Sequence, residues 1–288
     1  MVEIKLGGMG WSRTKGNGFM TGEASVSQSE IDQYERDGAI VLRKAFSDEW
    51  VERMRGGAER VMADGGPLAL EYTKEAGKGR FFGDQFIWPR DETFRAFVFE
   101  SPAAEIARRM MRSDTATLFY DHLLVKEAGT NEHTPWHHDL PYWPVEGDQV
   151  CSIWLALDPV SANSGGVEYI RGSHKWGKRY IGQSFSTDFD YSNPDMEPIP
   201  DIEAERDRHE FLIWDMEPGD CIVHHALTLH HSGANATSDR RRRGLATRWT
   251  GDDAVYTPRA STIRLLEDPG LTDGAPMPCK LFPQVLPR

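Results

Sequence analysis

The histidines of this chain are gathered in its middle part. All ten lie between His122 and His231, and the first 121 residues contain none. One of them, His137, precedes Asp139 by two positions in the segment WHHDLPYW. Residues two apart on an extended backbone point to the same side, so one imidazole and one carboxylate can bind the same cation. This H-x-D pair is the first candidate for metal chemistry.

A second group of histidines follows much later in the chain, as His224, His225, His230 and His231. Two histidines and one carboxylate form the facial triad of non-haem Fe(II) oxygenases, which leaves coordination positions open for a chelating cosubstrate and O₂. Zinc hydrolases also use two histidines and a carboxylate, with water as the remaining ligand. The residue types alone therefore indicate a metal site and leave iron and zinc both open.

The elements that must position these residues change in type along the chain. Before residue 115, capping and apolar patterns predict a helix from Ser27 to Asp37, a strand at 39–42, a helix from Ser47 to Gly65 and a helix from Ala103 to Met111. After residue 115, short β-type runs predict strands at 117–126, 149–157, 166–170, 211–214, 221–224 and 245–249. The fold class expected is mainly β, with an α-helical N-terminal flank.

Two segments fall outside this pattern. Residues 1–25 are rich in glycine and show little apolar periodicity, which predicts a flexible arm. Residues 178–208 are polar and acidic and form a long insertion between two core strands; insertions of this length often act as lids or binding loops. We expect a single domain over 26–288, with its β core at about 115–250 and both outlying segments as candidate lids.

The composition argues against several function classes. The chain has 288 residues and a net charge of −12, from 33 basic and 45 acidic side chains, and its one dense basic run, 240–243, is too short for a nucleic-acid groove. No window approaches the roughly 18 apolar residues of a membrane span, and the N-terminal segment lacks an apolar signal region. Three widely spaced cysteines argue against a disulfide framework. We expect a cytoplasmic protein without nucleic-acid or membrane partners.

Further motifs join the histidines in an ordered series. They are the H-x-D after Trp136, the Pro-Tyr-Trp that follows it, the segment 154–159, the glycine-containing stretch 163–174, the Pro-Gly-Asp at 218–220, and His230-x-Ser232-Gly233-x-Asn235 followed by arginines. This series, which runs from about Ser27 to the C-terminus, resembles the phytanoyl-CoA dioxygenase family of Fe(II)- and 2-oxoglutarate-dependent oxygenases. The resemblance implies a double-stranded β-helix, a cupin-like jelly roll, with the metal near its open end.

The resemblance also implies a role for each histidine. His137, Asp139 and His230 become the ligands of Fe(II), and His138 then points away from the metal. The Ser-Gly-x-Asn sequence behind His230 favours that residue over its neighbour as the distal ligand. The remaining candidates for contacts with the substrate or with the ligands are His224, His225 and His231.

The far carboxylate of 2-oxoglutarate needs a cation, and arginine binds a carboxylate through two parallel hydrogen bonds while staying charged. The family spacing puts this residue on the last core strand. Counting forward from His230 gives Arg241, whereas counting back from Trp249 gives Arg242, and we favour Arg242. The resemblance implies three further cosubstrate contacts, namely Ser232, Trp143 and Trp154.

The strand predicted at 117–126 is expected beside the active site. Alternation puts Tyr120, His122 and Lys126 on one face and Asp121 on the other. Either face can be the inner one.

The activity implied is the oxidation of an unactivated C–H bond, with 2-oxoglutarate and O₂ converted to succinate and CO₂. Related halogenases lack the carboxylate ligand, so the presence of Asp139 predicts hydroxylation or a similar oxidation. A small or medium-sized metabolite is the expected substrate, because the net charge of −12 disfavours an acyl-CoA. An acyl-CoA hydroxylase of the same family remains an alternative, as does a non-catalytic β-helix protein that binds a ligand.

Overall fold

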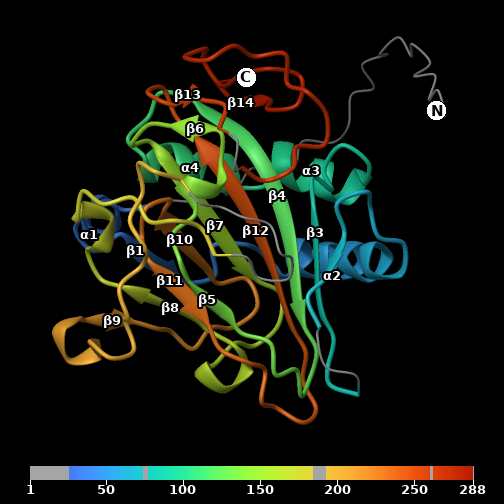
Figure 1. Ribbon diagram of the computed structural model, residues 1–288. Coiled ribbons are helices and arrows are strands. Elements are labelled where there is room, and N and C mark those ends of the chain that lie inside the picture. The colour runs from blue at the N-terminus through green and yellow to red at the C-terminus, as the bar shows by residue number, and fades with distance from the viewer. Residues whose placement is uncertain (1–25, 74–76, 184–192, 260–261, 288) are drawn as a thin grey trace.

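The computed structural model describes residues 26–73, 77–183, 193–259 and 262–287. Two antiparallel sheets face each other, and the helices of the described residues lie on the outer side of the larger sheet (Figure 1). This arrangement confirms the predicted mainly β, double-stranded β-helix core with an α-helical N-terminal flank. The predicted arm at 1–25 lies outside the described residues.

The larger sheet has the strand order β1-β10-β7-β12-β4-β3-β2, with β14 paired to β4. Its strands are β1 (Ala39–Leu42), β2 (Leu70–Glu71), β3 (Phe81–Gln85), β4 (Ala116–Lys126), β7 (Val150–Ala156), β10 (Cys221–His225), β12 (Arg242–Thr250) and β14 (Gln284–Leu286). The first and last strands of the described chain therefore belong to one sheet.

The smaller sheet has the order β5-β11-β8-β9. Its strands are β5 (Thr134–His137), β8 (Val167–Ile170), β9 (Phe211–Leu212) and β11 (His230–Ser232), and a separate pair joins β6 (Val145–Glu146) to β13 (Val255–Tyr256). The connection from β8 to β9 contains the predicted insertion at 178–208. Its described part includes an isolated bridge between Tyr180 and Glu197 and a short 3₁₀ turn, Arg206–Arg208.

The three predicted helices are confirmed as α1 (Gln28–Asp37), α2 (Asp48–Ala63) and α4 (Ala103–Met110), and a further helix, α3 (Glu92–Glu100), lies before α4. Ser27 accepts a hydrogen bond from the N–H of Glu30, and Gly38 ends α1 at a φ of 80°, where a side chain would be strained. None of the helices in the described part of the chain has the length and apolar character needed to cross a bilayer.

Several elements were not predicted, among them the helix α3 and the strand β3. α3 begins after Asp91, whose carboxylate accepts hydrogen bonds from the N–H groups of Thr93 and Phe94. Its sequence contains three phenylalanines and a valine, which have only moderate helix propensity. β3 was missed because its residues Gly83 and Asp84 are uncommon in strands.

β12 lies at the centre of the larger sheet, between β4 and β7, and its side chains serve two different environments. Leu245 joins the core beneath the helices, whereas Arg242, Ala246 and Arg248 face the smaller sheet. In the register of the sheet, Arg248 lies opposite Ser152 of β7 and Tyr120 of β4. This alternation decides which arginines reach the interior.

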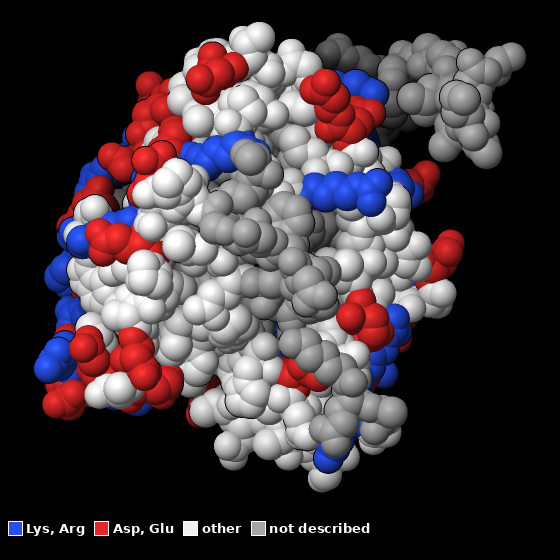
Figure 2. Space-filling view, viewed as in Figure 1, with Lys and Arg blue, Asp and Glu red and all other residues white. Residues whose placement is uncertain are grey.

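Basic and acidic side chains lie next to one another in several clusters on the face shown in Figure 2, most of them toward its left edge. Several are joined by ion pairs, such as Arg112 with Asp32 at 2.9 Å and Arg206 with Glu168 at 2.9 Å. Exposed pairs contribute about 0–1 kcal/mol each. The apolar cores on the two faces of the larger sheet, and not these surface charges, hold the fold.

Gly244 leaves the space that the Trp154 indole occupies. A Cβ added at this glycine would stand 2.1 Å from the indole ring, so Gly244→Ala must displace the buried Trp154 or the strand. We expect the substitution to lower the unfolding free energy by about 1–3 kcal/mol in urea denaturation.

The matched control for this prediction is Gly56→Ala in α2. The nearest atom to its added methyl group is 3.9 Å away, and the substitution should raise the unfolding free energy by about 0.5–1 kcal/mol. A Gly244→Ala protein as stable as the wild type would contradict the packing described.

Candidate metal centre and cosubstrate cavity

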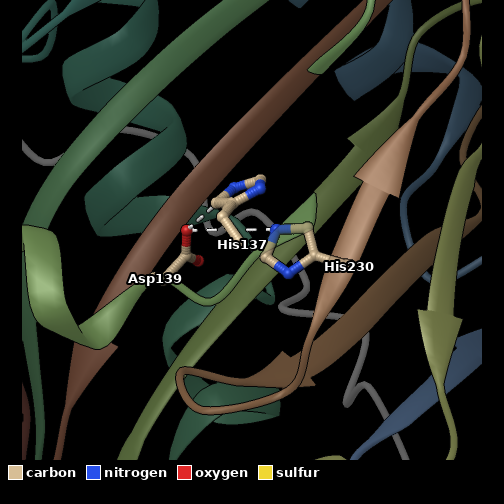
Figure 3. Close-up of side chains that lie close together, drawn as sticks. All are labelled: His137, Asp139 and His230. Carbon is tan, nitrogen blue, oxygen red and sulfur yellow. Dashed lines mark ion pairs between the residues drawn. The ribbon is translucent and has the colours of Figure 1, made fainter. Parts of the chain in front are cut away.

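His137, Asp139 and His230 converge on one point inside the fold, as Figure 3 shows. One ligand atom from each side chain lies within 4.8 Å of the other two. The Nε2 atoms of His137 and His230 are 3.9 Å and 4.0 Å from Asp139 Oδ1. All three side chains are buried. The structure therefore brings the three predicted ligands together, with room for one cation between them.

The pairing of β5 with β11 places the two histidines. His137 ends β5 and His230 begins β11, and the two residues are directly opposite in antiparallel register. The backbone conformation at Asp139 differs from the extended one that was expected. Its φ of −70° and ψ of −42° are helical, and it precedes the 3₁₀ turn Leu140–Tyr142. The prediction of an extended H-x-D segment is wrong there, because the chain turns after β5 ends.

Hydrogen bonds fix the protons of both imidazoles. The Nδ1–H of His137 donates to the carbonyl of Pro135 at 2.8 Å, and that of His230 donates to the carbonyl of Thr228 at 2.9 Å. A carbonyl oxygen only accepts, so each Nε2 keeps its lone pair. Burial lowers the pKa of both imidazoles, which are therefore neutral at pH 7. Each ring presents a nitrogen that can bind a metal.

The carboxylate of Asp139 is oriented by bonds to its other oxygen. Oδ2 accepts hydrogen bonds from the hydroxyl of Ser152 at 2.8 Å and from Nε2–H of His224 at 3.1 Å. The hydroxyl of Tyr169 in turn donates to Nδ1 of His224 at 3.3 Å. Burial by itself raises the pKa of Asp139, but Arg248 and His224 outweigh it and hold that pKa well below its usual range. The carboxylate is ionised, with Oδ1 facing the histidines.

This arrangement satisfies the requirements of an iron site. Two neutral imidazoles and one carboxylate are the donors of the facial triad that binds non-haem Fe(II). Each of the three ligands also has the orienting hydrogen bond that metal-binding side chains characteristically have. The residues present therefore fit an iron ion.

A cavity opens beside these ligands and extends along β12 to Arg242. The Arg242 guanidinium is buried over the indole of Trp154, with Cζ 5.4 Å from the ring centroid. Within the described part of the chain, its Nε has no hydrogen-bond partner. Burial lowers the pKa of Arg242 to about 10, which leaves it charged at neutral pH. A buried cation with a free donor is suited to bind an anion.

Ser232 is held near the same end of the cavity by Lys126, which lies opposite Arg242 in the sheet. The fully buried Lys126 Nζ donates to Ser232 Oγ at 2.7 Å and to the carbonyl of Gly233 at 2.6 Å. Because the hydroxyl oxygen accepts this bond, the hydroxyl hydrogen is available to a ligand. Burial, reinforced by Arg242, holds the pKa of Lys126 well below its usual range.

Arg241, the other candidate for the cosubstrate cation, does not enter the cavity. Its guanidinium pairs with Glu59 at 2.6 Å and with Glu127 at 3.2 Å, and more than a third of the side chain is exposed. Neighbouring residues alternate in direction along an extended chain, so only one of these two arginines can face the interior. The interior position belongs to Arg242.

The histidines that the sequence left without a role lie in different places. His138 points away from the ligands and accepts a hydrogen bond from the N–H of Tyr180 at 2.9 Å, and burial lowers its pKa to about 4. His225 donates to the carbonyl of Asp148, and His231 bonds to the carboxylate of Glu168, each at 2.9 Å. Among His224, His225 and His231, His224 is the one that contacts a predicted ligand.

The inner face of β4 is the one that carries Tyr120 and His122, which both line the cavity. Asp121 faces the other way and accepts hydrogen bonds from the N–H groups of Ile87 and Trp88, at 2.8 Å and 3.0 Å. This settles the choice between the two faces that the sequence left open.

The structure separates the two predicted tryptophans. Trp154 lies beside Arg242, whereas Trp143 lies beside Arg248, with the Arg248 Cζ 5.9 Å from its ring centroid. The Trp143 indole N–H donates to the Tyr120 hydroxyl at 3.0 Å. Sequence reasoning missed three residues of this region, although alternation along the predicted strands was a usable signal for each. They are Ser152, Tyr169 and Arg248.

The model of the family described as phytanoyl-CoA dioxygenase (PhyH) matches residues 34–244. The chain belongs to this family. An ectoine dioxygenase of Sphingopyxis alaskensis is 23% identical over 231 residues, which cover 75% of this chain and 74% of that protein. The human peroxisomal phytanoyl-CoA dioxygenase is 30% identical over 242 residues, which cover 77% of this chain and 68% of that protein.

Solved structures share the fold. The epimerase SnoN, in complex with Fe³⁺, α-ketoglutarate and nogalamycin RO, has a TM-score of 0.70 at 22% identity and covers 88% of this chain and 96% of its own. EctD from S. alaskensis with bound Fe has a TM-score of 0.63 at 20% identity and covers 81% and 79%. These structures confirm the expected jelly-roll core, and membership of the family confirms the expected enzyme class, an iron- and 2-oxoglutarate-dependent dioxygenase.

The hydrogen bond from His224 to Asp139 yields a test of the metal site. His224→Phe preserves a ring of similar size and removes the bond, so Asp139 loses one of its two orienting donors. We expect Fe(II) affinity to fall by about 10–100-fold in anaerobic calorimetric titration.

The control is His225→Phe, which alters the adjacent side chain of β10 that bonds to Asp148 outside the cluster. It should bind Fe(II) as the wild type does. Equal losses in both variants, or no loss in His224→Phe, would show that His224 does not orient the carboxylate.

Proposed function

We propose that His137, Asp139 and His230 hold Fe(II) and that Arg242 and Ser232 bind the far carboxylate of 2-oxoglutarate. The enzyme then hydroxylates, or otherwise oxidises, an unactivated C–H bond of a small or medium-sized metabolite, releasing succinate and CO₂. The observation that carries this proposal is the presence of three oriented ligands and a buried guanidinium with a free donor in one cavity. We place this activity in the cytoplasm, in a single domain over 26–288.

Iron, 2-oxoglutarate and O₂ supply the oxidising chemistry when they are bound. The protein's part is to hold its ligands in fixed protonation states. The carbonyls of Pro135 and Thr228 keep a proton on Nδ1 of His137 and His230, so both Nε2 atoms stay available. Ser152 and His224 keep the carboxylate of Asp139 from rotating, because both donate to Oδ2. The three donors therefore need no rearrangement of protons to bind the metal.

The cosubstrate end of the cavity is built for a carboxylate. Arg242 can offer a planar pair of N–H donors, and the Trp154 indole restricts how its guanidinium can turn. Lys126 occupies the acceptor side of Ser232, which leaves the hydroxyl hydrogen for the same carboxylate. A zinc hydrolase has no need of such an anchor at this place. The anchor therefore favours a dicarboxylate cosubstrate over hydrolytic chemistry.

The oxidative outcome follows from the third ligand. Asp139 occupies the position that related halogenases leave to a halide, so hydroxylation or a similar oxidation is the proposed outcome. The solved structures that share the fold include an epimerase and a carbocyclase, both described as α-ketoglutarate dependent. An oxidation other than hydroxylation is therefore compatible with this fold.

The turnover of 2-oxoglutarate in the absence of substrate tests the iron assignment. Anaerobically purified protein supplied with Fe(II), 2-oxoglutarate and O₂ should form succinate, and His137→Ala or Asp139→Ala should reduce this formation by at least about 100-fold, because the metal is lost. Normal succinate formation in either variant would contradict the ligand set.

A pair of neighbouring arginines tests the cosubstrate anchor. Arg242→Ala should weaken 2-oxoglutarate binding by roughly 10–100-fold, since a hydrogen-bonded buried charge pair is lost, as measured by anaerobic calorimetry with Fe(II). Arg241→Ala removes only the exposed pairs with Glu59 and Glu127 and should bind 2-oxoglutarate normally. The reverse pattern would transfer the role to Arg241.

A further inference from the structure

The cavity contains a second buried guanidinium, that of Arg248, which the proposed binding of iron and 2-oxoglutarate does not use. Its side chain is 7% exposed and lines the cavity. The Nε and Nη1 atoms are buried and have no hydrogen-bond partner among the described residues. Surface arginines such as Arg112 and Arg206, in contrast, are joined to carboxylates.

Aromatic rings hold this guanidinium in place without neutralising it. Its Cζ lies 5.0 Å from the centroid of Tyr120 and 5.9 Å from that of Trp143. The Trp143 indole N–H donates to the Tyr120 hydroxyl, so the two rings form one rigid support. Cation–π contacts of this kind orient a charge, but they supply no acceptor for its N–H groups. Arg248 is thus positioned in advance, with the hydrogen bonds of its Nε and Nη1 unmade.

Arg248 and Arg242 serve different ends of the cavity. They lie six residues apart on the same face of β12, so their Cα atoms are separated by about 20 Å along the strand. Their surroundings also differ: Arg242 lies over Trp154 beside Lys126, and Arg248 lies at the level of Ser152, which bonds to Asp139. A five-carbon dicarboxylate is shorter than this span. One molecule of 2-oxoglutarate anchored at Arg242 therefore leaves Arg248 to another ligand.

The sum of the charges in the cavity with Fe(II) and 2-oxoglutarate bound indicates whether that ligand is positive or negative. Fe(II) and 2-oxoglutarate carry opposite double charges and cancel, and the carboxylate of Asp139 balances one of the two guanidinium groups, Arg242 and Arg248. Asp139 is the one carboxylate among the described residues that line the cavity. One positive charge is then left over in the cavity, and a proton on Lys126 would only increase the excess; Arg248 is the guanidinium that the cosubstrate leaves without an anion. A buried charge without a partner is strongly unfavourable, so the balance requires one negative charge from a ligand.

We infer that the substrate of this enzyme carries a carboxylate, which binds to Arg248 and so positions the reacting C–H bond near the metal. A carboxylate matches both the single charge and the flat, two-donor edge of a guanidinium. The neighbouring lining residues Tyr142, Trp143 and Ile263 are aromatic or apolar, which suits an apolar body attached to that carboxylate. This inference rests on the proposed function, because it counts the charges of iron and 2-oxoglutarate.

Matched pairs of ligands and variants test this role. Wild-type protein loaded anaerobically with Fe(II) and 2-oxoglutarate is titrated calorimetrically with benzoate, cyclohexanecarboxylate and straight-chain carboxylates, and with the carboxamide of each. We expect some of these carboxylates to bind at least tenfold tighter than their carboxamides. Arg248→Gln should abolish the preference, Arg248→Lys should restore part of it, and Arg241→Gln should leave it as in the wild type.

The affinity for 2-oxoglutarate shows whether Arg248 binds the carboxylate of the substrate or a carboxylate of the cosubstrate. Arg248→Gln should bind 2-oxoglutarate with the wild-type affinity. A tenfold loss would make Arg248 a cosubstrate residue and overturn the inference. A preference for carboxylates over carboxamides that persists in Arg248→Gln would also overturn the inference. Equal affinity of the wild type for every carboxylate and its carboxamide would overturn it as well. Failure of the wild type to bind 2-oxoglutarate would instead overturn the proposed function.

Discussion

The positions of four protons determine what this site can do. The Nδ1–H groups of His137 and His230 are held by backbone carbonyls, and the hydrogen bonds of Ser152 and His224 all end on one oxygen of Asp139. These bonds leave two lone pairs and one carboxylate oxygen directed at a common point. Reversing either imidazole would put an N–H where the metal must bind. The surrounding fold keeps the side chains of His137, Asp139 and His230 from rotating.

The two sheets contribute different groups to the site. The smaller sheet supplies both histidines through the pairing of β5 with β11, so their separation is fixed by a backbone ladder. The larger sheet supplies the groups that orient and charge the site, including Ser152 from β7, His224 from β10 and the two inward arginines of β12. The helices pack on the opposite face of this sheet, and none of their residues lines the cavity.

The sequence was sufficient for the parts of the site that depend on residue type and strand periodicity. The H-x-D spacing singled out His137 and Asp139, and the resemblance to the phytanoyl-CoA dioxygenase family selected His230 among the four later histidines. Arg242 and Arg241 differed by one position, and only the register of β12 shows which of them faces inward. The helical backbone of Asp139 was not predictable, since the turn after β5 depends on contacts made across the fold. Alternation along the last core strand puts Arg248 on the same face as Arg242, but the lack of hydrogen-bond partners for its Nε and Nη1 among the described residues comes from what surrounds it in three dimensions.

The central claim is that one metal ion is bound by three named atoms, and crystallography of the iron-loaded protein tests it directly. Anomalous diffraction at the iron edge, from crystals grown without O₂, locates the ion independently of the protein atoms. The account predicts a single strong peak bonded to Nε2 of His137, Oδ1 of Asp139 and Nε2 of His230. A peak bonded instead through His224 or His231, or one that omits Asp139, would contradict it.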